Sequence, residues 1–264
     1  RHAFRGGNFF MLRMLARYRA ELGVVARPAE LELAARRTIE HLQGQAARVA
    51  VDVRREEEDR LVADVVVENL AGHKLPTAYP SRRAWVHFVV LDGSGSIVFE
   101  SGRLNADGSI VGNDNDDDPR RYEPHYETIA RSDEVQVYEA IMAGPDDRVT
   151  TGLLSAVRYV KDNRVLPRGF EPATASGDIA VRGRATADDD FRGGRDRVRY
   201  VIDTGEAGGP FTVEAELWYQ PIGYRWARNL ADYDAFETRR FTRYYEAMSA
   251  GSAVLVASGS ASAP

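Results

Sequence analysis

The chain has 264 residues, of which 44% are hydrophobic and 28% charged, a balance that excludes a wholly disordered or fibrous protein. It contains no cysteine, which excludes disulfides, cysteine-ligated zinc or iron–sulfur clusters and covalently attached haem within this chain. The net charge of −5 carries no basic excess, so we expect no nucleic acid partner. Its apolar runs are far shorter than the roughly 20 residues of a bilayer span, so we expect no transmembrane segment.

Residues 8–47 are predicted to form a helical hairpin. Asn8 can cap a first helix that ends at Gly23. Pro28 suits the first turn of a second helix, which Gly44 would stop.

From residue 48 to residue 220 the apolar period changes to two, which predicts strands. The turn at 92–96 joins two apolar runs and signals a β-hairpin. The predicted strands are 48–54, 61–70, 84–91, 97–101, 135–141, 157–160, 178–185, 198–202 and 211–219. These short strands predict a mainly β fold, an antiparallel β-sandwich of the immunoglobulin or jelly-roll kind, with an N-terminal helical hairpin and a C-terminal helix.

The last part of the chain divides into a helix and a tail. Residues 222–249 read as helical and are rich in aromatic side chains, whereas 250–264 contains mainly small residues and is predicted to be flexible. We therefore expect three segments: helical 1–47, a sandwich at 48–220, and a helix with a tail at 221–264.

An acidic loop, NDNDDD at residues 113–118, is the strongest local signal for a ligand. So many oxygen donors suit calcium, which takes six to eight oxygen ligands. Counting from Asp114, Pro119 and His125 occupy positions where an EF-hand needs glycine and glutamate, so this is not an EF-hand. The expected ligands are Asn113, Asp114, Asp116, Asp118 and Glu123. The alternative is a solvated acidic loop, and we expect that state for the second run, Asp188–Asp190.

The usual catalytic signatures are missing from the sequence. It has no GxSxG, GxGxxG or HExxH motif, and no two of the five histidines are four residues apart. His87 alternates with apolar residues on a strand and is predicted to be a packed or edge histidine. The loop GHKLPTAYPSRR at 72–83 is predicted to be an ordered crossover, with docking or anion contact as its alternative.

Several segments together resemble multihaem c-type cytochromes. RHAFRGGNFFMLRML at the start resembles the point where the haem-bearing part of these proteins ends. GHKLPTAYPSRRAWVHFVVLD, DGSIVGNDND, YEPHYETI, QVYEAIM and LPRGF resemble their haem-free, β-rich C-terminal region. The resemblance extends over residues 1–228. It departs from the family in one respect, because no CxxCH haem-attachment motif occurs here.

The sequence opens at Arg1 without a methionine, so we expect a mature form or a fragment. The resemblance implies an extracytoplasmic, periplasmic location, and His2 as an axial haem ligand if a partner's haem lies nearby. It implies a partner that is a cytochrome or a membrane-associated respiratory or photosynthetic complex. Without a haem segment of its own, the chain's apolar N-terminal face needs another cover. Its expected docking residues are Phe4, Phe9, Phe10, Met11 and Met14.

We therefore expect a non-catalytic accessory subunit that docks on an electron-transfer complex. One alternative is a redox enzyme or electron-transfer protein whose haem part lies outside this chain. Another is a calcium-dependent module that binds protein or carbohydrate.

Overall fold

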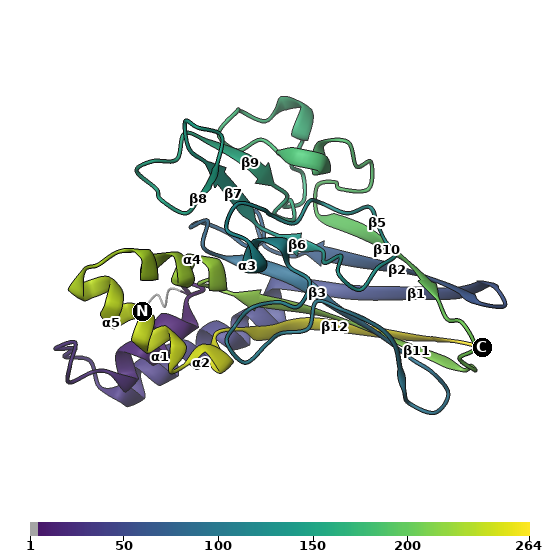
Figure 1. Ribbon diagram of the computed structural model, residues 1–264, viewed down its shortest axis with the longest axis horizontal. Coiled ribbons are helices and arrows are strands. Elements are labelled where there is room, and N and C mark those ends of the chain that lie inside the picture. Colours follow the sequence, from purple (N-terminus) through teal and green to yellow (C-terminus); the bar gives the residue numbers. More distant parts are fainter. Residues whose placement is uncertain (1–4) are drawn as a thin grey trace.

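The structure, a computed structural model, describes residues 5–264. It confirms the predicted fold class: the chain is mainly β with antiparallel sheets, an N-terminal helix pair and a C-terminal helix (Figure 1).

One sheet has the strand order β1-β2-β10-β5. It consists of β1 (Ala47–Glu57), β2 (Arg60–Asn69), β10 (Arg195–Asp203) and β5 (Thr128–Ile129). All neighbours are antiparallel except the short pair β10 and β5. Side chains along β2 and β10 alternate between buried and half-buried, as expected for strands with one face on a core.

The second sheet has the order β12-β11-β3-β4, and β6 pairs with β3. Its strands are β12 (Val254–Ala263), β11 (Phe211–Gln220), β3 (Arg83–Leu91), β4 (Ile97–Ser101) and β6 (Val137–Tyr138), all antiparallel. The predicted hairpin at 92–96 therefore joins β3 to β4.

The two sheets pack face to face through apolar side chains. Phe88 on β3 stacks on Tyr200 of β10, with ring centroids 3.7 Å apart and planes 7° from parallel. Buried residues of β2, β10, β3 and β11 belong to one core, which makes the sandwich.

A third, smaller layer lies over one end of the sandwich, at the top of Figure 1. Its sheet has the order β8-β7-β9, from β7 (Ala140–Ala143), β8 (Val149–Thr150) and β9 (Arg158–Asp162). The strand predicted at 178–185 is wrong: this segment has one bridge, Arg182 to Asp162, and then a 3-10 turn. The short helices outside the helical end are α3 (Asp114–Asp117), η2 (Pro172–Thr174) and η3 (Gly183–Thr186).

The predicted N-terminal hairpin is present. It contains α1 (Phe9–Arg17) and α2 (Pro28–His41), which continues into the π-helical turn η1 (Leu42–Ala46). Asn8 caps α1 as expected, because its side-chain oxygen accepts a hydrogen bond from the amide of Met11 at 2.9 Å.

The predicted helix at 222–249 is broken into α4 (Tyr224–Arg228), η4 (Asn229–Asp232), α5 (Phe236–Glu246) and η5 (Ser249–Gly251). Aromatic pairs join it to α1 at the left of Figure 1: Phe10 packs edge-on to Tyr245 at 5.5 Å, and Tyr18 stacks on Tyr244 at 3.7 Å. The three predicted segments thus contribute to one core. No helix of residues 5–264 has the length and apolar character to cross a bilayer.

The tail predicted to be flexible is instead strand β12, so that prediction is wrong. β12 pairs with β11 along its length and lies against β1. A Cβ atom on Gly259 would lie 2.9 Å from the backbone oxygen of Val49, so the small side chains that suggested flexibility allow this close approach.

Candidate functional site

The acidic loop forms the short helix α3, and its central carboxylate is part of a buried ion pair. Asp116 accepts two hydrogen bonds from the guanidinium of Arg83, at 2.7 and 2.9 Å. Its Oδ2 also accepts the amide of Ile110 at 2.8 Å. Asn113 caps the helix by accepting from the amide of Asp116 at 2.9 Å. These two expected ligands therefore have structural partners.

Two further carboxylates of the loop pair with different arginines. Asp118 pairs with Arg120 at 2.7 Å, and Asp114 pairs with Arg121. The pair with Arg120 holds the pKa of Asp118 well below its usual range. Arginines thus neutralise carboxylates that the sequence pattern led us to expect around a calcium ion.

Glu123, the fifth expected calcium ligand, is buried and only partly satisfied. Its Oε1 accepts the amide of Asp114 at 2.9 Å, whereas Oε2 has no hydrogen-bond partner. Burial raises the pKa of Glu123 to about 7, against the effect of the hydrogen bond from Asp114. In the described chain these five residues do not form a group of metal-ligating atoms around one point. Calcium binding at this loop is not tested, and because arginines pair with its carboxylates we expect none.

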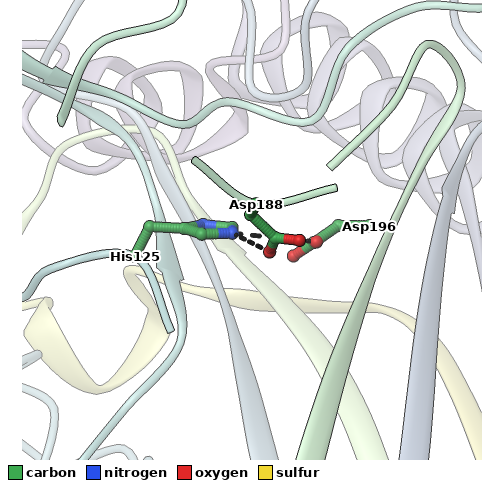
Figure 2. A group of neighbouring side chains, drawn as sticks. All are labelled: His125, Asp188 and Asp196. Atoms are coloured by element: carbon green, nitrogen blue, oxygen red, sulfur yellow. Dashed lines mark hydrogen bonds and ion pairs between the residues drawn. The ribbon is translucent and has the colours of Figure 1, made fainter. Parts of the chain in front are cut away.

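A different group of ligating atoms lies between the third layer and the first sheet: His125, Asp188 and Asp196 (Figure 2). Their ligating atoms all lie within 4.8 Å of one another, and all three residues are buried. His125 Nε2 is 2.9 Å from Asp188 Oδ2 and 3.8 Å from Asp196 Oδ1. His125 lies in the segment after α3, Asp188 in the loop before β10, and Asp196 on β10.

The amides around His125 determine which ring nitrogen carries hydrogen. Gln136 and Asn163 each turn an NH2 group to Nδ1, at 2.9 and 3.1 Å. Neither amide can be reversed, because the oxygen of Gln136 accepts the amide of Tyr126 and that of Asn163 accepts the amide of Glu139. Nδ1 is therefore an acceptor, and Nε2 carries the hydrogen that it donates to Asp188.

This arrangement does not fit a metal ion. A histidine that ligates through Nε2 normally donates its Nδ1 hydrogen to an oxygen. Here Nδ1 faces two N–H donors, so a metal on Nε2 would require an imidazolate or the loss of both amide contacts. Both ring nitrogens are engaged within the protein, so His125 is also not placed as a general base.

The two carboxylates of the group differ in their surroundings. Burial by itself would raise the pKa of Asp188, but the hydrogen bonds from His125 and from the amide of Asp190 lower it below its usual value. Burial raises the pKa of Asp196, against the hydrogen bond from Tyr138 at 2.7 Å. Its Oδ1 has no hydrogen-bond partner. The group is a buried polar network in which the surroundings favour the charged form of Asp188 more than that of Asp196.

Sequence reasoning missed this group. The second acidic run was predicted to be solvated, yet the side chain of Asp188 is 2% exposed. The residues are 63 and 8 positions apart in the chain, so no spacing rule connects them. His87, predicted to be a packed or edge histidine, lies between Glu216 and Glu100 at 3.1 and 3.0 Å.

The expected docking residues are mostly part of the chain's own core. Phe9, Phe10 and Met14 are 0%, 0% and 1% exposed, so they offer no surface to a partner. Their cover is the helical C-terminal segment together with the sandwich, and not a haem domain. Met11 is half-buried and lines a groove. Phe4 and the expected haem ligand His2 lie outside the described residues.

That groove has a volume of about 820 Å³ and a mainly apolar lining. It lies between the β2–β3 loop, the loop after β8 and the C-terminal helices, at the helical end of Figure 1. Tyr79 and Trp226 meet edge-on there at 5.5 Å. Ala78, beside Tyr79, has a φ of 61°, a left-handed conformation that is uncommon for alanine. Further lining residues are Arg82, Leu153, Leu154, Leu230, Tyr233 and Phe241.

No protein-family model and no curated protein matches the chain. Among solved structures it is similar to the crystal structure of a penta-haem cytochrome c552 from Thermochromatium tepidum, with a TM-score of 0.44 and 14% sequence identity. The likeness covers 85% of this chain and 41% of that cytochrome, so the chain spans less than half of its length. At this TM-score the likeness carries no argument about function.

Proposed function

We propose that the chain is a non-catalytic accessory subunit that docks, outside the cytoplasm, on a cytochrome or on a membrane-associated electron-transfer complex. The resemblance of its sequence motifs to multihaem cytochromes suggests the kind of partner. The observation that carries the docking role is the apolar groove at the helical end.

The groove combines the features of a protein interface. Leu154 is fully exposed, and Tyr79 and Tyr233 are 48% and 60% exposed. Exposed apolar side chains gathered in one place mark interaction sites, and aromatic residues with arginine are enriched in them. Arg82, which also lines the groove, forms no ion pair with a carboxylate of residues 5–264. We infer a partner surface with an apolar centre and a carboxylate at its edge.

The test is capture of a haem-bearing partner from native membrane extracts by the tagged chain. Leu154→Ser and Tyr233→Ser should lose the partner, which is followed by its Soret absorbance. Ile97→Ser is the matched control, because Ile97 is 60% exposed on the β3–β4 hairpin away from the groove. Deletion of α1 would be a poor test, since α1 belongs to the core.

The outcomes separate the hypotheses. Retention by the wild type and Ile97→Ser, with loss by the two groove variants, supports the proposal. Equal capture by all four proteins would place docking elsewhere, and capture without haem absorbance would contradict the choice of partner.

A further inference from the structure

A small cavity of about 80 Å³ lies between the N-terminal segment, the end of α2, the β2–β3 loop and the end of β11. Its polar side chains are basic or carry hydroxyl groups: Arg5, Thr38, His41, His73, Thr77, Arg82 and Tyr219. No carboxylate of residues 5–264 lines it, and the sequence has none among residues 1–4. The cavity therefore concentrates positive charge and donors without an acidic counter-charge.

The two guanidinium groups keep free donors. Arg5 donates from Nη1 to the carbonyl of Arg37, and Arg82 donates from Nη2 to the carbonyl of Gly6, both at 2.9 Å. Neither forms an ion pair with a carboxylate of the described chain. Because a guanidinium has five N–H donors, most of them remain available to an oxyanion.

The backbone leaves room for this arrangement at one residue. Gly7 has a φ of +74°, and a Cβ atom there would lie 3.0 Å from Arg82 Nη1 and 3.3 Å from the hydroxyl of Tyr219. Glycine thus allows the N-terminal segment to lie directly against the guanidinium.

His73 also lines the cavity. Its Nδ1 lies 3.0 Å from the carbonyl of Lys74, so Nδ1 carries hydrogen and Nε2 has no partner among the described residues.

We propose that this cavity binds a small oxyanion, either a carboxylate or a phosphate group. Guanidinium groups bind both through parallel hydrogen bonds. The volume suits one such group and not a nucleotide. This inference does not depend on the docking function, although Arg82 lines both the cavity and the groove.

The experiment is calorimetric titration of the full chain with inorganic phosphate and, separately, with acetate, at fixed ionic strength in chloride. Arg5→Gln should weaken binding about tenfold, the cost of one charge-assisted hydrogen bond. Arg19→Gln is the matched control, because Arg19 is also exposed and donates to a backbone carbonyl, that of Ala26, at 2.9 Å. Unchanged melting temperatures of the variants show that they are folded.

Binding of phosphate alone supports the cavity as a phosphate site, and binding of acetate supports it as a carboxylate site. Equal affinity of the wild type and Arg5→Gln would overturn the proposal. Absence of binding by either ion would overturn it too. Loss of partner capture by groove variants that still bind the anion would leave this proposal intact.

Discussion

Arg83 and Asp116 form a buried bidentate ion pair between β3 and α3, with side chains only 5% and 1% exposed. Removing one partner of such a pair leaves a charge without compensation. We expect Asp116→Ala to lower the free energy of unfolding by about 3–5 kcal/mol, and replacement of both residues by apolar ones to recover much of this loss. Urea unfolding checks both variants. A loss below about 1 kcal/mol in Asp116→Ala would contradict the assigned role.

Glu123 should make stability depend on pH near neutrality. Its pKa rises from 4.5 to about 7 on folding, so the folded state holds the proton more tightly. The resulting stabilisation is present below pH 4.5 and is lost as pH rises through about 7. Between pH 5 and pH 8.5 the free energy of unfolding of the wild type should therefore fall by up to about 3 kcal/mol more than that of Glu123→Gln. Glu127→Gln, an exposed neighbour, is the control and should follow the wild type.

Asp188 and Asp196 should respond differently to the same substitution. Asp188→Asn removes the charged acceptor of His125 Nε2 and should lower the free energy of unfolding by about 1–3 kcal/mol. Asp196→Asn keeps an oxygen for Tyr138 and removes a carboxylate whose charge is disfavoured by burial, so it should be neutral or stabilising at pH 8. Chemical denaturation compares the two variants. Equal losses, with zinc bound only by the wild type, would instead indicate that the carboxylates act together as metal ligands.

The acidic loop gives a direct test for calcium. Since Asp114, Asp116 and Asp118 already pair with arginines, we expect equal melting temperatures in excess chelator and in millimolar calcium. Differential scanning calorimetry with elemental analysis checks this. A higher melting temperature in calcium that Asp118→Asn abolishes would show that the ion displaces Arg120.

Gly259 tests whether the C-terminal strand is part of the fold. A methyl group at this position meets the backbone of Val49, so Gly259→Ala should destabilise the protein by about 1–3 kcal/mol. Ser258→Ala, at an exposed neighbouring position of β12, should have little effect. Thermal unfolding of the pair measures the difference. No difference would mean that β12 contributes little to stability.

Local patterns predicted the elements well where one face is apolar. The alternation in β2 and β3, the turn at 92–96 and the cap at Asn8 depend on neighbours in the sequence, and all are present. β12 was missed because its small residues have low strand propensity, and it forms through close contact with β1.

The candidate sites were harder to predict, because their partners are distant in the chain. The acidic loop was visible as a run, but Arg83, which pairs with Asp116, is 33 residues away. The contacts of His125 come from four separate segments, and the cavity at Arg5 also brings together four. Sequence spacing does not predict such contacts, because they form only when the folded sheets bring the segments together.

The contact between Phe10 and Tyr245 can form only after α5 has been synthesised. A ribosome releases α1 long before α5, so Phe9, Phe10 and Met14 remain uncovered while the sandwich strands are made. The pairing of β11 with β12 waits for the same last stretch of chain. We expect the apolar face of α1 to stay exposed on the growing polypeptide until α5 has been made, and chaperones to be needed there most.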